Sequence, residues 1–174
     1  SSSHAKTLVA GPDAGFGIWH ESLNEAKSII SRYSLKVTRV HTHIGSGTNP
    51  DEWAQVAQTS LNLLKEFPAS ITLNLGGGFK VARMPHEKST DISAVSTRIS
   101  EILEKFYADT GRKIALELEP GTFLTANAGT ILTTIQDVTR DAHTIIKLRG
   151  GMSEIIRPAL YGAEHPLKVI PACA

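Results

Sequence analysis

Three short clusters in this 174-residue sequence have residue types suited to binding an anionic, ring-bearing ligand. They are His-Ile-Gly-Ser at 43–46, Gly-Gly-Gly at 76–78 and Glu-Pro-Gly at 119–121, and each follows a short apolar run typical of a strand. The first offers a flat imidazole and a hydroxyl, the second exposed backbone N–H groups and the third a carboxylate. Because functional groups of parallel α/β folds gather where strands end and loops begin, we expect the three clusters to form one site.

The histidine cluster has two chemical interpretations. His41 and His43 are alternate residues of a predicted strand and therefore share one face. An imidazole there can stack on a heteroaromatic ring or bind a metal ion, whereas Ser46 and the neighbouring glycines can donate hydrogen bonds to an anion. The plainer alternative, that a histidine only packs and the glycines only form a turn, is about equally consistent with this segment.

The glycine and glutamate clusters indicate which class of ligand the site would bind. Residues 76–78 lack Cβ atoms, so their backbone can approach a phosphate closely. Neither a Gly-Lys-Ser/Thr ending nor a Gly-x-Gly-x-x-Gly spacing accompanies them, which favours a small phosphate over a nucleotide. Glu119 could hold a protonated ring nitrogen, although by itself the segment is more typical of a solvated acidic turn.

The surrounding pattern alternates helices with strands. Helices are predicted from a capping box at Ser22, from Asn49 followed by Pro50, and from Ile92 to a stop at Gly111. Strands are predicted over 35–44, 71–75 and 114–118. This order indicates right-handed βαβ units and a parallel sheet, hence an α/β fold.

After residue 121 the pattern changes. Two strand-like runs, 130–138 and 143–148, are joined by a short polar turn with no helix between them, which predicts an antiparallel hairpin. We therefore expect a boundary near residues 125–129. The predicted parts are a parallel α/β part over 1–127 and the start of a mainly antiparallel β part over 128–174.

Composition and charge exclude several classes of partner. Hydrophobic residues make up 41% and charged residues 20% of the sequence, and the net charge is +1, which favours neither nucleic acid nor an anionic membrane. No apolar run reaches transmembrane length, and the first residues do not resemble a signal peptide. The single cysteine, Cys173, cannot form an internal disulfide, so a cytoplasmic location is expected.

The motifs together resemble one known family. In order and spacing, the sequence is similar to the fold type III (alanine-racemase-like) pyridoxal-phosphate decarboxylases, above all their diaminopimelate-specific branch, over residues 11–166. The matching segments are Phe-Gly-Ile at 16–18, the three clusters above, Gly-Met at 151–152 and Ile-Arg-Pro-Ala-Leu-Tyr-Gly-Ala at 156–163. The resemblance implies that residues 1–127 are the latter part of a (β/α)8 barrel and that 128–174 begin the C-terminal β-domain. It also implies pyridoxal phosphate as cofactor, an amino-acid substrate and a homodimer with shared active sites.

The resemblance also implies roles for individual residues. His43 would stack on the pyridine ring, Glu119 would hydrogen-bond the protonated ring nitrogen, and Arg157 and Tyr161 would bind the distal group of the substrate. The remaining cofactor contacts would come from small residues of the three clusters: Ser46, Gly76, Gly77, Gly78 and Gly121. Without the family, a helix cap for Arg157 and simple packing for Tyr161 would be the preferred interpretation.

The sequence departs from the family pattern at several points. Thr122 stands where the family usually has an arginine, which leaves the substrate open, and Arg149 stands where an acidic or small residue is usual. No lysine occupies the position of the catalytic Schiff-base lysine, and the later Cys-Glu segment of the family is absent. We therefore expect the middle of a longer enzyme that is inactive and poorly soluble by itself, with no Schiff-base absorbance band on titration with pyridoxal phosphate.

The predicted activity is decarboxylation of meso-diaminopimelate to L-lysine. Within the family, the alternatives are an ornithine- or arginine-type decarboxylase and a non-catalytic relative that binds pyridoxal phosphate. Outside it, His41 and His43 resemble the paired histidines of metal-dependent barrel hydrolases. That alternative needs more ligands at later strand ends, so no metal site is predicted.

Overall fold

A three-stranded parallel sheet organises the first part of the protein. The computed structural model describes residues 15–171. Strands β1 (Arg39–His41), β2 (Thr72–Asn74) and β3 (Ala115–Glu117) pair in the order β1-β2-β3. All pairs are parallel, and Val40, Leu73 and Leu116 lie in register across the sheet. The α/β class with a parallel sheet is thus confirmed, although each strand is shorter than its apolar run predicts.

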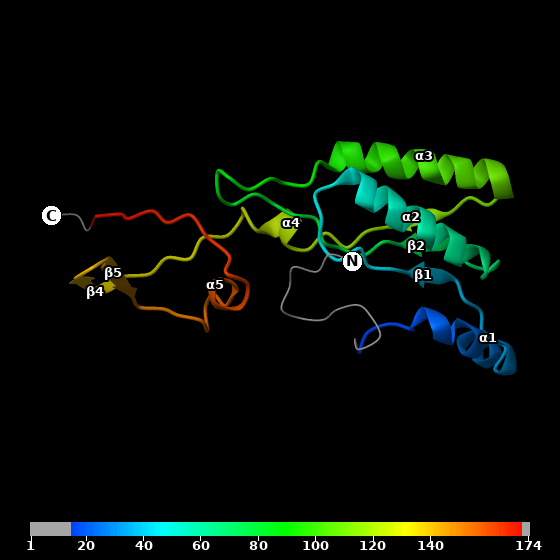
Figure 1. Cartoon of the computed structure of the whole chain (residues 1–174), viewed down its shortest axis with the longest axis horizontal. Coiled ribbons are helices and arrows are strands. Elements are labelled where there is room, and N and C mark those ends of the chain that lie inside the picture. Colours follow the sequence, from blue (N-terminus) through cyan, green and yellow to red (C-terminus); the bar gives the residue numbers. More distant parts are fainter. Residues whose placement is uncertain (1–14, 172–174) are drawn as a thin grey trace.

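Two long helices cover one face of this sheet. Helices α2 (Pro50–Lys65) and α3 (Ile92–Thr110) pack side by side against the strands (Figure 1). The core between them contains the fully buried side chains of Trp53, Leu61 and Leu73. Because side chains alternate along a strand, the residues next to Leu73 point to the other face, and among the described helices α2 is the one whose backbone closely approaches the strands.

The ends of the long helices follow their sequence signals. The Asn49 side chain accepts a hydrogen bond from the N–H of Asp51 at 3.0 Å, and Asp91 accepts one from the N–H of Ala94 at 3.0 Å. Gly111 ends α3 in the left-handed conformation, with φ of 67°. Local capping chemistry therefore fixes the helix positions, as the sequence predicts for the Asn49 and Gly111 ends.

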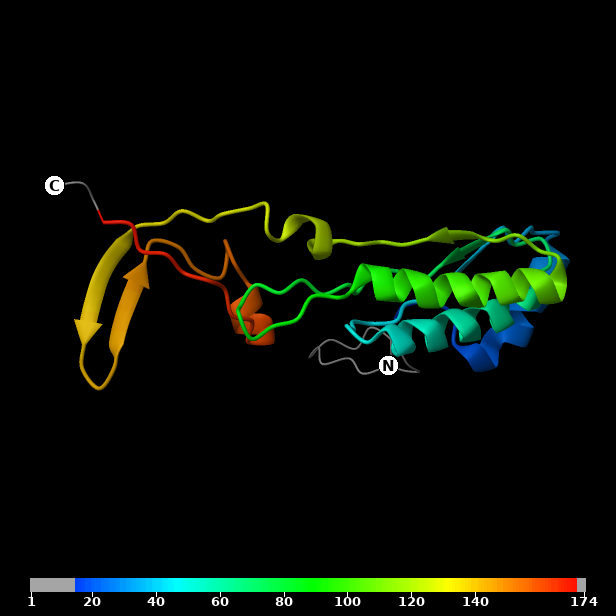
Figure 2. The ribbon, with the colours of Figure 1, turned by 90° about the horizontal axis from the view of Figure 1, so that it is seen from above.

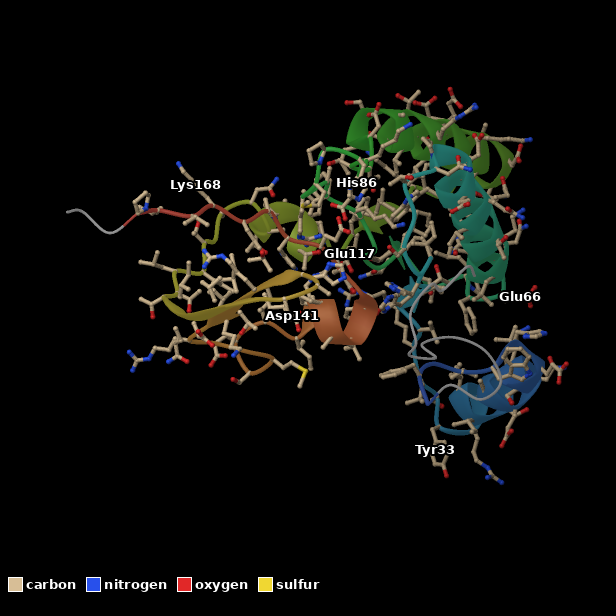
Figure 3. The ribbon with its side chains drawn as sticks, turned by 60° about the vertical axis from the view of Figure 1, so that its left-hand side comes forward. Tyr33, Glu66, His86, Glu117, Asp141 and Lys168 are labelled. Carbon is tan, nitrogen blue, oxygen red and sulfur yellow. The ribbon has the colours of Figure 1, made fainter. Side chains whose placement is uncertain are left out.

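The predicted capping box at Ser22 is wrong. Helix α1 (Leu23–Arg32) is present, but the Ser22 side chain makes no capping hydrogen bond. The physical reason is the 3₁₀ turn η1 (His20–Ser22), which leads directly into α1 and leaves Ser22 with φ −85° and ψ 6° instead of an extended conformation. The helix contains no buried residue, and Tyr33 behind it points away from the rest of the protein (Figure 3).

The second part of the protein is extended and has little core. After the short helix α4 (Thr122–Thr125), strands β4 (Ile135–Arg140) and β5 (Thr144–Leu148) form an antiparallel pair, as predicted. Figure 2 shows this hairpin far from α2 and α3. The chain then returns toward the sheet as the short helix α5 (Arg157–Tyr161). Helix α4 was not predicted, whereas a helix at Arg157 was implied only by the interpretation of that residue as a helix cap. The domain boundary stays a prediction.

Some of the residues discussed above lie outside the part of the chain that the structure describes. Cys173 and residues 11–14 of the family-like region lie outside the described residues. Within residues 15–171, every helix is too short or too polar to cross a membrane.

Candidate functional site

One cavity of about 680 Å³ lies where the three parallel strands end. The loops after β1, β2 and β3 line it, together with the start of α5. Seven of the residues predicted for the site are among its lining residues: His43, Ser46, Gly77, Gly78, Glu119, Gly121 and Arg157. Three clusters that are far apart in sequence are thus brought to one place.

The glycines allow these loops to touch. A Cβ on Gly77 would collide with the carbonyl oxygen of Glu119, and a Cβ on Gly78 would collide with that of Gly45. Gly78 also has φ of +98°, which side chains rarely adopt. The glycines were predicted to let a phosphate approach the backbone closely. In the structure, their missing Cβ atoms also make room for neighbouring backbone.

Two backbone donors of this loop remain free for a ligand. Among the described residues, the N–H groups of Gly77 and Gly78 have no protein acceptor, and both glycines line the cavity. In contrast, the N–H of Gly76 donates to the side chain of Asn74 at 2.7 Å, and Gly76 does not line the cavity. Unlike Gly77 and Gly78, Gly76 therefore has no free N–H group to donate to a phosphate in the cavity.

The carbonyl group of Gly47 ties the first two loops together. It accepts hydrogen bonds from the Thr90 hydroxyl at 3.0 Å and from the Trp53 indole at 3.4 Å. The Thr90 hydroxyl in turn accepts from the N–H of Lys80 at 2.8 Å. The Trp53 ring stacks on Phe79, a lining residue, with ring centroids 4.2 Å apart. The cavity wall is thus anchored directly in the core.

The acidic side of the cavity is a hydrogen-bonded group. The amide of Asn74, on β2, donates to Glu119 at 3.0 Å and to Glu117 at 3.3 Å. Glu117, labelled in Figure 3, also pairs with Arg39 at 2.9 Å. Since Asn74 engages only one oxygen of Glu119, the other oxygen remains available to a group in the cavity.

Four of the lining residues are cations, which we call the cationic wall. Lys80, Arg83 and Lys88 come from the loop between β2 and α3, and Arg157 comes from α5. Glu87 lies among them, but its carboxylate accepts hydrogen bonds from the N–H groups of Arg83 and Met84. These hydrogen bonds hold the pKa of Glu87 below its ordinary value.

A contact beyond this loop reaches the C-terminal segment. The His86 ring lies 3.6 Å from the carboxylate of Glu164, which follows α5 (His86 is labelled in Figure 3). Tyr161, predicted to bind substrate, does not line the cavity; its ring lies 5.9 Å from the Arg157 guanidinium. Arg157 begins α5 and its Nε, buried, has no partner among the described residues.

Sequence reasoning missed several residues of the site. Asn74 and Thr90 are both buried and hold the loops in place, and the cations of the loop after β2 were given no role. A polar asparagine inside an apolar run, two residues before the glycines, was the available signal for Asn74. His41 carries no metal-site signal, since no three His, Cys, Asp or Glu residues within 15–171 are arranged to hold a metal ion.

Comparison with known proteins identifies the family. Residues 1–126 match the family described as pyridoxal-dependent decarboxylase, pyridoxal binding domain. The chain belongs to this family. The matched range contains all three clusters that converge on the cavity, and pyridoxal phosphate is the cofactor of the family.

Relatives and solved structures agree with this assignment. The chain is 28% identical over 169 residues to diaminopimelate decarboxylase from Escherichia coli (strain K12), a match that covers 96% of this chain and 40% of the relative. The match to diaminopimelate decarboxylase from Streptomyces coelicolor is also 28% identical and covers 96% and 38%. The chain therefore spans about 40% of the length of the curated relatives it matches.

Solved structures of family members superpose well on this fold. A crystal structure of diaminopimelate decarboxylase has a TM-score of 0.82 and 28% identity, and the match covers 91% of this chain and 38% of that one. The diaminopimelate decarboxylase from M. jannaschii, in complex with L-lysine, has a TM-score of 0.76 and 26% identity, with 89% and 38% covered.

Proposed function

We propose that this chain forms the cofactor site of a pyridoxal-phosphate-dependent diaminopimelate decarboxylase, which converts meso-diaminopimelate to L-lysine and CO₂. One observation carries the proposal: an imidazole, two free backbone N–H groups and a carboxylate meet around a single cavity at three strand ends. The family and the relatives supply the reaction class.

The lining residues fit the chemistry of pyridoxal phosphate. The free N–H groups of Gly77 and Gly78 and the Ser46 hydroxyl supply donors for a phosphate, and Lys80 adds positive charge nearby. His43 offers a flat ring at the end of β1 for stacking on the pyridine. Gly121, which also lines the cavity, leaves space beside the acidic residue.

Glu119 is assigned to the pyridine nitrogen. Its second carboxylate oxygen is free to accept a hydrogen bond from a protonated ring nitrogen, and Asn74 holds the first. When bound, pyridoxal phosphate supplies an electron-accepting ring that stabilises the charge left on the substrate Cα as CO₂ departs. The part of Glu119 is to keep the ring nitrogen protonated, so that this charge can be accepted.

The cationic wall favours a substrate with an acidic tail. Lys80, Arg83, Lys88 and Arg157 line the cavity, and Glu87, the acid in the same loop as Arg83, is engaged by backbone N–H groups. A carboxylate on the far end of the substrate is attracted to such a wall, and the planar guanidinium of Arg157 can bind it with two hydrogen bonds. The cationic tails of ornithine and arginine would be repelled, which places diaminopimelate first.

The remaining parts of the proposal concern the whole protein. We infer that the three strands belong to a (β/α)8 barrel, that the enzyme is a cytoplasmic homodimer, and that the Schiff-base lysine comes from a part of the protein outside this chain. The parallel strands with α2 packed on one face support the barrel, because the strands of a (β/α)8 barrel are parallel and its helices lie on the outside.

The test is a decarboxylase assay on the complete reading frame that encodes this chain. We expect CO₂ release from meso-diaminopimelate with pyridoxal phosphate present, and at least tenfold lower kcat/KM for ornithine and arginine. Arg157→Ala should raise KM for diaminopimelate, with Arg98→Ala, on the exposed side of α3, as the control. Preference for ornithine or arginine would overturn the substrate assignment, and cofactor binding without CO₂ release from any of the three would indicate the non-catalytic relative.

A further inference from the structure

We propose that Asn74 is a positioning residue that fixes the distance between the phosphate-binding glycine turn and the carboxylate of Glu119. This inference rests on the proposed function, because it assumes that both groups hold pyridoxal phosphate. Asn74 ends β2, directly before the glycine loop, and only 5% of its surface is exposed.

The orientation of the Asn74 amide follows from its partners. Its oxygen accepts the hydrogen bond from the N–H of Gly76 at 2.7 Å, so its nitrogen must be the atom that faces the acidic residues. That nitrogen lies 3.0 Å from Glu119 and 3.3 Å from Glu117. Two carboxylates have no proton to donate, so only this orientation satisfies every partner.

One side chain therefore binds to both ends of the site. Through its oxygen, Asn74 holds the turn that leads to the free N–H groups of Gly77 and Gly78. Through its nitrogen, it holds Glu119, whose side chain is otherwise exposed at the end of β3. A rigid ligand with a phosphate at one end and a ring nitrogen at the other needs these two contacts at a fixed separation.

The neighbouring charged side chains do not hold Glu119 in place. Arg39 is engaged by Glu117 at 2.9 Å, and the His43 ring lies against the glycine turn. Among the described residues, Asn74 is the only side chain that hydrogen-bonds the Glu119 carboxylate. Loss of its amide nitrogen would leave Glu119 free to rotate away from the ring nitrogen.

The substitution Asn74→Asp tests the contact to the acids apart from the contact to the glycine turn. Aspartate keeps an oxygen for the N–H of Gly76 but places a second oxygen against Glu119 and Glu117, so the contact to the turn is kept and the contacts to both acids are lost. In equilibrium dialysis of the full-length protein, the Kd of this variant for pyridoxal 5′-phosphate should be at least about tenfold higher than that of the wild type. Affinity for 1-deazapyridoxal 5′-phosphate, which lacks the ring nitrogen, should change less than about threefold.

Two further variants make the result decisive. Asn74→Ser, which is too short to reach Glu119, should give the same selective loss if the aspartate variant fails to fold. Asn62→Asp makes the same change on the exposed side of α2, away from the cavity, so both ligands should bind it as they bind the wild type.

Each alternative result has a definite meaning. Equal weakening of both ligands in the Asn74 variants means a merely structural role and overturns the inference while the proposed function stands. Unchanged affinity for pyridoxal 5′-phosphate overturns it as well. If the wild type binds neither ligand, the proposed function fails, and the inference fails with it.

Discussion

Glu87 shows how one carboxylate can organise the cationic loop. Hydrogen bonds from the N–H groups of Arg83 and Met84 lower its pKa in the folded state. A lowered pKa means that the contribution to stability is present above the ordinary glutamate range and is lost as the pH falls through the lowered value. The loop should therefore stay ordered at neutral and mildly acidic pH and loosen only in stronger acid.

Amide chemical shifts in NMR spectra can check this expectation. The Arg83 and Met84 amide signals should move together as the pH falls below the ordinary glutamate range. Glu87→Gln, which keeps an acceptor oxygen but cannot titrate there, should remove this dependence. Movement of the two signals near neutral pH would contradict the assignment.

Gly77 illustrates packing between loops at the scale of one atom. Gly77→Ala places a methyl group against the carbonyl oxygen of Glu119, so the end of β3 must shift. Overpacking of this kind costs about 1–3 kcal/mol in the free energy of unfolding. Urea denaturation should show this loss, whereas Gly129→Ala, where nothing lies within 4 Å of the new Cβ, should stay within about 0.5 kcal/mol of wild type.

At the scale of elements, Arg112 secures the end of α2. Its guanidinium donates to the carbonyl groups of Leu64, Phe67 and Ser70, at 3.4, 3.2 and 2.7 Å. Arg112→Lys offers a single ammonium in place of the fork and should lower the free energy of unfolding by about 1–3 kcal/mol. Thermal or urea unfolding tests this, with Lys113→Ala, an exposed neighbour, as control; equal effects of the two substitutions would contradict the role.

Elements with local signals could be predicted from the sequence. Asn49, Pro50 and Gly111 act within one turn of their helix, so their effect is readable from spacing alone. Strand ends were less predictable, because apolar runs continue past the last paired residue: Leu75 is buried although β2 ends at Asn74. The turn before α1 displaced its cap, an effect that pairwise cap rules do not include.

The site was predictable where glycines and charged groups follow strands, and less so where tertiary contacts decide. His43 and Glu119 reach one cavity because the carboxyl ends of parallel strands lie at the same edge of a sheet. Thr90 lies 43 residues from Gly47, its acceptor, and no local pattern predicts that pairing. Tyr161 was predicted at the cavity, but the single turn of α5 directs only Arg157 there.

At the scale of the whole molecule, the exposed hairpin should drive self-association. Apolar side chains on β4 and β5 remain exposed, among them Ile135, Ile145 and Ile146, and the outer strand edges are unpaired within the described residues. Ile145→Lys should raise the concentration at which the 174-residue chain associates in analytical ultracentrifugation. Tyr107→Lys on α3 is the matched control, because Tyr107 and Ile145 are both 56% exposed; an equal effect of the two would argue against the hairpin.

The stacking of Trp53 on Phe79 gives the protein an intrinsic optical probe of its cavity. The indole is wholly shielded from water, and its N–H binds the same carbonyl that holds the loops together. The sequence has one other tryptophan, Trp19, which is partly exposed, so Trp19→Phe would leave a single tryptophan, at the cavity wall, whose emission can be excited selectively. Quenching of that emission would then report, without any label, the arrival of a light-absorbing molecule beside Phe79.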